Sequence, residues 1–146
     1  MANTIKIKKW VDIIEEFIAH EAITPGMLVE QISTGKVQKH ASEDGIVLPM
    51  FVLEDELQGE TITDDIDADA PAQVWIPQRG EVVYALLKED ENVAIGALLS
   101  SKGDGTLKEF TEDSSTGEVY PGQVVGVATE AVNASGGNVR IKVRIF

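Results

Sequence analysis

The same arrangement of glycines and apolar residues occurs twice in the chain, at a spacing of 70 residues. Gly26 aligns with Gly96 before an apolar pair, and Gly35 aligns with Gly105 before a polar-apolar strand. Glycine tolerates the positive φ that tight hairpin turns require. Each copy therefore predicts a strand, a hairpin turn on glycine, a second strand, a loop and a third strand. The two predicted β units cover approximately residues 25–54 and 95–130.

Short apolar runs bounded by turn residues recur about every ten residues, which is typical of a β-barrel or sandwich. A chain of 146 residues with 43% hydrophobic residues is sufficient for one domain. We predict a mainly β protein with a small barrel-like or sandwich-like body of the β-tulip type and an internal pseudo-repeat. An acidic loop is expected at residues 54–72. The expected strands are 27–30, 36–40, 48–53, 74–76, 82–87, 93–100, 106–110, 124–132 and 139–145.

The first 21 residues follow this pattern less closely. The alternation at Ile5-Lys6-Ile7-Lys8 is typical of a strand, whereas apolar residues from Trp10 to Ile18 recur at the spacing of an amphipathic helix. Both structures remain open from the sequence. We therefore predict an N-terminal arm at 1–21, helical or extended, followed by a single β domain at 22–146.

The formal net charge of −13 disfavours binding to nucleic acid and to anionic membranes. No apolar run approaches the roughly 20 residues of a membrane span. No secretory leader follows the basic N-terminus, so we expect synthesis in the cytoplasm. Half of the 12 basic residues lie at the two chain ends, either as solvated strand faces or as contacts to an acidic partner. They are Lys6, Lys8, Lys9, Arg140, Lys142 and Arg144.

The sequence offers little for catalysis or metal binding. It has no cysteine, and its two histidines, His20 and His40, are not grouped as zinc ligands are. His40 aligns with Phe110 in the repeat, which predicts a packing or surface role. A phosphate-binding loop and a nucleophile elbow are both absent from the sequence. We predict a protein that is not an enzyme and has no cofactor.

One acidic motif, Asp65-x-Asp67-x-Asp69, has the spacing that opens a calcium-binding loop. Such a loop requires glycine at its sixth position and glutamate at its twelfth. Here those positions hold Ala70 and Ile76. We therefore predict a solvated acidic loop and no metal site.

Turn and strand motifs beyond residue 21 can be compared with known families. They are Ala22–Glu30, Gly35–Ala41, Phe51–Gly59, Val74–Leu87, Asn92–Gly96, Gly103–Lys108, Val124–Val132 and Arg140–Ile145. In these stretches the chain resembles the capsid decoration, or cement, proteins of tailed bacteriophages. The first twenty residues are less typical of that family.

The resemblance implies a virion protein, made in the host cytoplasm, that binds the outer surface of the capsid. It would clamp neighbouring subunits of the major capsid protein together and assemble with itself as a trimer or, in second place, a dimer. The alternating N-terminal segment could add a strand to an exposed capsid edge. An equal alternative is that this segment packs on its own barrel. The predicted capsid-binding residues are Ile5, Lys6, Ile7, Lys8, Lys9 and Trp10.

Two other functions are compatible with an acidic, β-rich chain. One is a tail or fibre component of a phage, which the sequence separates poorly from a decoration protein. The other is a small trimeric nucleotide hydrolase such as a dUTP pyrophosphatase, which the missing phosphate-binding and catalytic motifs disfavour.

Overall fold

The computed structural model describes residues 2–111 and 121–146, whose regular structure consists of strands and two short 3-10 helices. The mainly β prediction is confirmed. The strands are β1 (Lys6–Lys8), β2 (Ile14–Ile18), β3 (Val29–Gln31), β4 (Val37–Lys39), β5 (Phe51–Val52), β6 (Pro71–Trp75), β7 (Val82–Leu87), β8 (Asn92–Val93), β9 (Leu98–Ser101), β10 (Leu107–Glu109), β11 (Val124–Ala128), β12 (Val132–Asn133) and β13 (Val139–Ile145). The 3-10 helices are η1 (Glu56–Gln58) and η2 (Pro121–Gln123).

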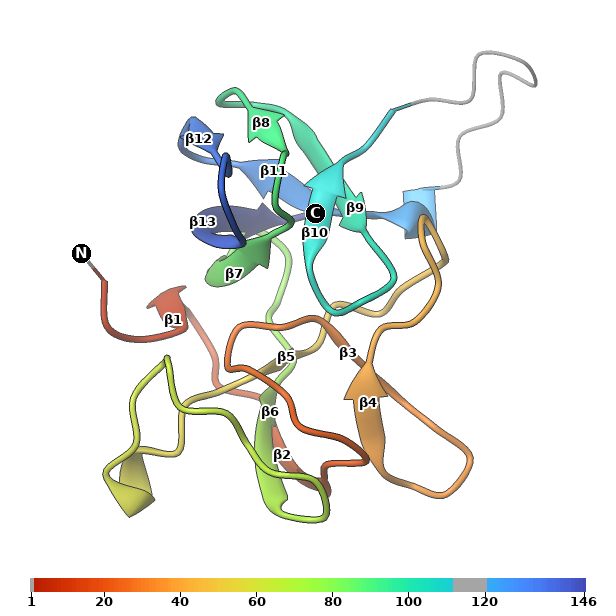
Figure 1. The fold of residues 1–146 in the computed structure, drawn as a ribbon, viewed down its shortest axis with the longest axis vertical. Helices are drawn as coiled ribbons and strands as arrows, with labels where there is room; N and C mark the ends of the chain where they lie inside the picture. Colours follow the sequence, from red (N-terminus) through yellow and green to blue (C-terminus); the bar gives the residue numbers. More distant parts are fainter. Residues whose placement is uncertain (1, 112–120) are drawn as a thin grey trace.

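Five strands of the C-terminal half close into a β-barrel, which occupies the upper part of Figure 1. β7 pairs with β13, β13 with β11, β11 with β9, β9 with β10, and β10 returns to β7. The pairings are antiparallel except for β10 with β7, which is parallel through Leu107 and Leu87. Closure of this kind leaves few unpaired strand edges.

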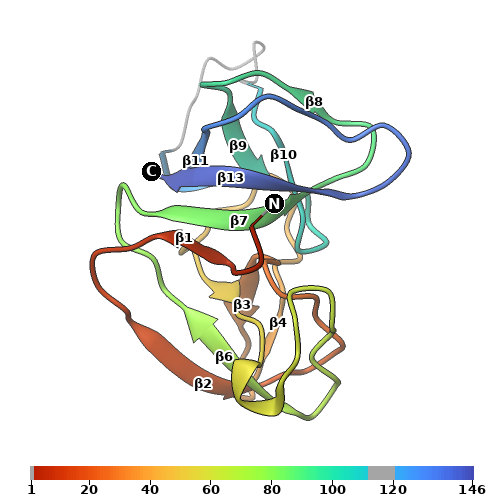
Figure 2. The ribbon, with the colours of Figure 1, turned by 90° about the vertical axis from the view of Figure 1, so that its left-hand side faces the viewer.

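The N-terminal half repeats the same circuit with β2, β6, β5, β3 and β4, below the other barrel in Figure 2. A bridge between Leu28 and Phe51 joins the start of β3 to β5. A parallel bridge between Ala19 and Val37 joins the end of β2 to β4, as Leu87 and Leu107 do in the other barrel. The equivalent strands are therefore β2 and β7, β3 and β9, β4 and β10, β5 and β11, and β6 and β13.

The two hairpins match residue for residue at the predicted spacing. Val29 pairs with Lys39 in the first, and Leu99 pairs with Glu109 in the second. The turn glycines also agree, since φ is +85° at both Gly35 and Gly105. By strand equivalence the repeat extends over residues 14–75 and 82–145, beyond the predicted units of 25–54 and 95–130. Residues 112–120 of the second unit lie outside the described residues.

The two barrels share a packed interface. The core of the second barrel includes Leu28, Phe51 and Trp75, all contributed by the first. Leu86 of β7 packs in return into the core of the first barrel. The guanidinium of Arg140 in β13 donates hydrogen bonds to the backbone of the first barrel, at the carbonyls of Pro25 and Ile62. The barrels therefore form one body.

Several predicted strands have different boundaries in the structure. The expected strand 93–100 is divided into β8 and β9 by a turn, in which Gly96 has a φ of +88° and the Ala97 N–H donates to the Ala94 carbonyl. The expected strand 124–132 is likewise divided into β11 and β12. β6 begins inside the expected acidic loop 54–72, with Pro71 at its first position, where a missing N–H is tolerated.

The N-terminal segment is extended, and the helical alternative is wrong. β1 pairs antiparallel with β7, with an irregular register between Lys6 and Lys8. β2 pairs with β6 along its whole length, from Ile14 opposite Trp75 to Ile18 opposite Pro71. Residues 14–18 of the predicted arm are therefore a strand of the first barrel.

Candidate interaction surface

The residues predicted to bind a capsid differ strongly in their accessibility. Ile5 is completely buried in the core of the second barrel. Its carbonyl accepts a hydrogen bond of 2.8 Å from the Tyr84 N–H, and its N–H donates to the Glu54 carboxylate at 3.3 Å. Lys6 and Ile7 are half-buried. In this conformation Ile5 is unavailable to a partner. Its burial agrees with the alternative in which the N-terminal segment packs on the protein's own barrel.

Lys8, Lys9 and Trp10 lie on the surface, and the side chain of Trp10 is 91% exposed. The Trp10 N–H donates to the Glu81 carboxylate at 2.7 Å, which fixes the backbone below the exposed indole. A hydrogen bond from Lys9 holds the pKa of Asp12 below its ordinary value, against the opposing effect of burial. The capsid-binding role of these three residues stays a prediction.

The exposed apolar surface continues from Trp10 into β2. Val11, Ile13, Ile14 and Ile18 are between 37% and 44% exposed. The six residues of the equivalent strand, β7, are all buried. Large apolar side chains exposed together on a strand are a signature of an interaction site. The sequence showed that apolar residues recur along this segment, but it could not show which of their side chains stay exposed to solvent.

The outer edge of β2 carries backbone groups that β6 does not use. The Ile13 carbonyl accepts from Ile76, and the Ala19 N–H donates to Ala70, so these two residues face β6. Because the direction of backbone hydrogen bonding alternates along an antiparallel strand, Ile14 and Glu16 face the opposite side. Among the described residues, no strand pairs with that side of β2 at these two positions.

The equivalent edge of β7 is occupied at both of its ends. At one end the Lys88 N–H donates to the Leu107 carbonyl at 2.9 Å, as the His20 N–H donates to Val37 in the first barrel. At the other end the Tyr84 N–H donates to the carbonyl of Ile5, the residue directly before β1. Tyr84 corresponds to Glu16, because Tyr84 lies four residues before Lys88 and Glu16 lies four residues before His20. β1 therefore covers on the second barrel the site that is open on the first.

An acidic groove of about 650 Å³ lies beside the outer face of β2 and β6. Seven carboxylates line this groove, and Lys6 is the single basic side chain among its lining residues. Ile14 and Glu16 contribute its wall from β2. The carboxylates are those of Glu16, Glu54, Asp55, Glu56, Glu60, Asp65 and Asp67. The open edge and the groove together form a surface suited to a partner with basic and apolar side chains.

One polar cluster has the composition of a catalytic triad. His40 contacts the Ser101 hydroxyl through Nδ1 at 2.7 Å and lies 3.7 Å from the Glu30 carboxylate through Nε2. Ser101 is completely buried, and its hydroxyl accepts a hydrogen bond from the Gly103 N–H. A nucleophile must reach its substrate, so this cluster suits packing between the two hairpins rather than acyl transfer.

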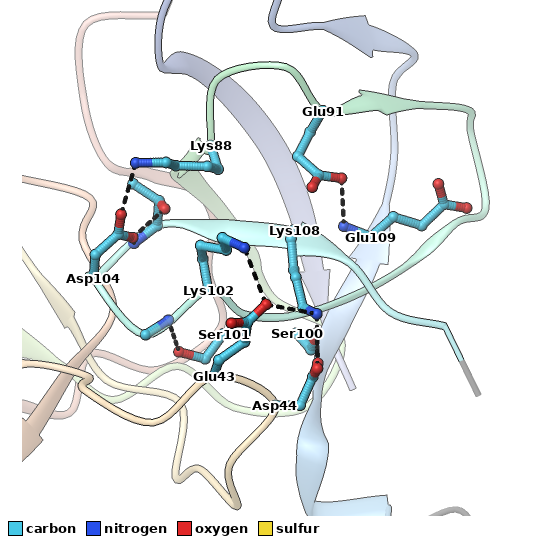
Figure 3. Close-up of polar contacts among 12 residues, drawn as sticks. Glu43, Asp44, Lys88, Glu91, Ser100, Ser101, Lys102, Asp104, Lys108 and Glu109 are labelled. Atoms are coloured by element: carbon cyan, nitrogen blue, oxygen red, sulfur yellow. Dashed lines mark hydrogen bonds and ion pairs between the residues drawn. The ribbon is translucent and has the colours of Figure 1, made fainter. Parts of the chain in front are cut away.

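Ion pairs support the same junction between the barrels, as Figure 3 shows. Lys108 of β10 lies between Glu43, at 3.1 Å, and Asp44, at 2.7 Å. Lys102 also contacts Glu43, at 3.0 Å, and Ser100 donates to Asp44 at 2.6 Å. These contacts hold the loop after β4 against the β9–β10 hairpin.

The acidic motif predicted to be a solvated loop makes contacts within the protein. Asp65 accepts a hydrogen bond of 2.7 Å from the Thr24 hydroxyl, and Asp69 forms an ion pair with Lys36 at 2.7 Å. Within residues 2–111 and 121–146, no group of three or more potential metal ligands is assembled. None of the helices in that part of the chain has the length and apolar character needed to cross a bilayer.

The fold is similar to that of a solved structure, the head fiber gp8.5 N base in bacteriophage phi29, with a TM-score of 0.57 and 16% sequence identity. The similarity covers 93% of this chain and 95% of that chain. At this identity the likeness shows the fold alone. No protein-family model matches the sequence, and no curated protein matches it.

Proposed function

We propose that the protein is a structural component of a tailed-phage virion that binds the outer surface of the head and cements neighbouring subunits of the major capsid protein. The observation that carries this proposal is the fold likeness, over nearly the full length of both chains, to a protein described as the base of a phage head fiber. The resemblance of the sequence motifs to capsid decoration proteins supports it independently.

The proposed function requires a rigid body with binding surfaces and no catalytic step. Two barrels joined by a packed apolar interface provide such a body. We infer that the protein acts as a trimer, or otherwise as a dimer, because several weak contacts to a symmetric shell become strong when they are linked. Its net charge of −13 suits a protein partner better than nucleic acid or an anionic membrane.

A second candidate is the base of a fibre, on the head or the tail. The description of the similar structure as a head fiber base favours it. A fibre base also binds the virion surface, but it must in addition carry a fibre. The two functions therefore differ in what is attached to the outward face of the protein.

Co-sedimentation of the purified full chain with expanded, undecorated phage capsids tests the proposal. Saturable binding at a fixed ratio to the major capsid protein is the expected result. Isolated tails provide the matched comparison in the same assay. Absence of binding to every capsid form would overturn the proposal, and binding to tails alone would favour a fibre base on the tail.

A further inference from the structure

We propose that the open edge of β2 is a docking site for an extended segment of the capsid subunit that alternates apolar and basic side chains. This inference rests on the proposed function and names the partner segment that the first barrel receives. It places the principal contact on β2 and the adjoining groove.

The outer edge of β2 has unpaired backbone groups to which another strand can bind. Ile14 and Glu16 direct their N–H and carbonyl groups away from β6, and no described strand covers them. Unpaired strand edges are templates for another chain, and proteins commonly protect them with proline, bulges or an overlying segment. Here the edge is flanked by the exposed side chains of Ile14 and Ile18, which a docked strand would cover.

The other barrel shows which chemistry fits this edge. There the equivalent positions are covered by Ile5 and the β1 strand that follows it, and residues 5–8 alternate between apolar Ile5 and Ile7 and basic Lys6 and Lys8. β1 runs antiparallel to β7, so the docked segment is expected antiparallel to β2. The carboxylates of the adjacent groove favour basic residues in the segment, and they repel an acidic one.

A second copy of this protein is the less suitable occupant. If two β2 strands paired symmetrically about Glu16, Glu16 of one strand would lie directly opposite Glu16 of the other, and such a like-charged pair is destabilising. The β1 strand of a second copy is engaged with its own β7, where Ile5 is completely buried. A segment from another protein avoids both costs.

A synthetic peptide of residues 3–9 is a suitable probe, because this sequence fills the equivalent edge on β7. Its binding to the full-length protein is measured by titration, and the position of binding by backbone amide NMR shifts. We expect saturable binding, with the largest shifts at Ile14 and Glu16. Binding that only displaces the protein's own β1, with shifts confined to β7, would overturn the proposal, as would the absence of binding.

The matched variants are Glu16→Pro and Glu16→Ala. Both lose the side-chain contact to Gln73, which is 2.7 Å long, but only proline removes the outward N–H while leaving the bonds to β6 intact. We expect Glu16→Pro to bind the peptide at least about tenfold more weakly than Glu16→Ala. Equal binding by the two variants would contradict a site on the β2 edge.

A charge variant covers the case in which Glu16→Pro does not fold. Glu15→Lys combined with Glu16→Lys keeps every backbone group, and we expect it to weaken binding of the basic peptide. Unchanged binding would count against the proposal.

Capsid co-sedimentation separates the two proposals. If the wild type binds capsids and the edge variants bind equally well, the docking site is wrong and the proposed function stands. If the wild type binds no capsid, the proposed function itself fails.

Discussion

At the scale of single residues, Gly26 and Gly96 occupy equivalent positions in surroundings that differ greatly. Both have a positive φ, +90° and +88°, which disfavours any side chain. A Cβ on Gly26 would lie 2.7 Å from the Tyr84 carbonyl oxygen and would collide with the Arg140 guanidinium, whereas a Cβ on Gly96 would meet open space. A substitution at Gly96 is therefore a control for the same substitution at Gly26, because only Gly26 is packed against the other barrel.

We expect Gly26→Ala to lower the free energy of unfolding by about 3 kcal/mol, as the sum of backbone strain and overpacking. Gly96→Ala should cost about 1 kcal/mol, since only the strain applies. Urea unfolding of both variants provides the comparison. Equal losses would mean that the close approach at Gly26 does not contribute to stability.

The carboxylate of Asp104 should make stability dependent on pH. Burial raises its pKa, but hydrogen bonds from Thr106 and Lys88 outweigh this effect, so the pKa lies below the ordinary 3.8. A folded-state pKa below the unfolded one means that stabilisation is present above 3.8 and is lost as the pH falls through the folded value. We expect Asp104→Asn to be less stable than the wild type at neutral pH and equally stable well below 3.8. A constant difference at every pH would contradict this assignment.

The sequence could predict single residues only where the repeat or a spacing rule constrained them. Aligning His40 with Phe110 indicated a packing or surface role, and its ring is in fact buried, with 2% exposure. The contact of His40 with Ser101 was not predictable, because the two residues belong to different hairpins and lie 61 positions apart in the chain. The interface role of Arg140 was missed for the same reason, since its acceptors lie in distant loops.

At the scale of elements, strands with local signals were predicted well. The prediction of 82–87 and 139–145 agrees with β7 and β13, which pair with each other and have long apolar or alternating runs. The prediction for the N-terminal segment stayed open between helix and strand, because residues 10–18 have the apolar spacing of a helix whereas residues 5–8 alternate as a strand does. Pairing of β2 with β6, which is 57 residues distant, decides in favour of the strand, and no local pattern contains that information.

Ile5, which packs against β7, and Ile14, which is partly exposed on β2, should differ in how much they contribute to stability. We expect Ile5→Ala to lower the free energy of unfolding by about 3 kcal/mol, because a fully buried isoleucine leaves a cavity. Ile14→Ala should cost less than about 1 kcal/mol, since Ile14 is 37% exposed. Thermal or urea unfolding measures both. A small loss at Ile5 would show that β1 is not a stable part of the barrel.

The same burial changes how the N-terminal prediction must be tested. Deleting residues 2–10 would remove Ile5 from the core together with Trp10 from the surface, so a loss of capsid binding would not distinguish unfolding from a lost contact. Substitutions at the exposed Lys8, Lys9 and Trp10 keep the core intact. A loss of capsid binding in these variants would therefore indicate a lost contact to the capsid and not the loss of the N-terminal strand from β7.

At the scale of the whole molecule, the sequence revealed a repeat but not its extent. The hairpins were found because their offset of 70 is constant and carries glycines. The equivalent strands β2 and β7 have almost no residues in common, and Glu16 aligns with Tyr84 at an offset of 68. The open edge therefore became visible only when pairing showed that one strand is covered by β1 and the other is not.

The shared interface predicts that the two barrels unfold together. Leu28, Phe51 and Trp75 belong to the first barrel by connectivity but pack in the core of the second, so neither barrel can lose its structure without exposing the apolar surface of the other. In a Trp10→Phe variant, fluorescence reports on Trp75 alone, which is completely buried, while far-UV circular dichroism reports on the strands of both barrels. We expect one transition with the same midpoint by both probes. A second step in circular dichroism, or a fluorescence midpoint at a different urea concentration, would mean that the barrels are independent folding units, and that the edge of β2 belongs to a module that can open without the other.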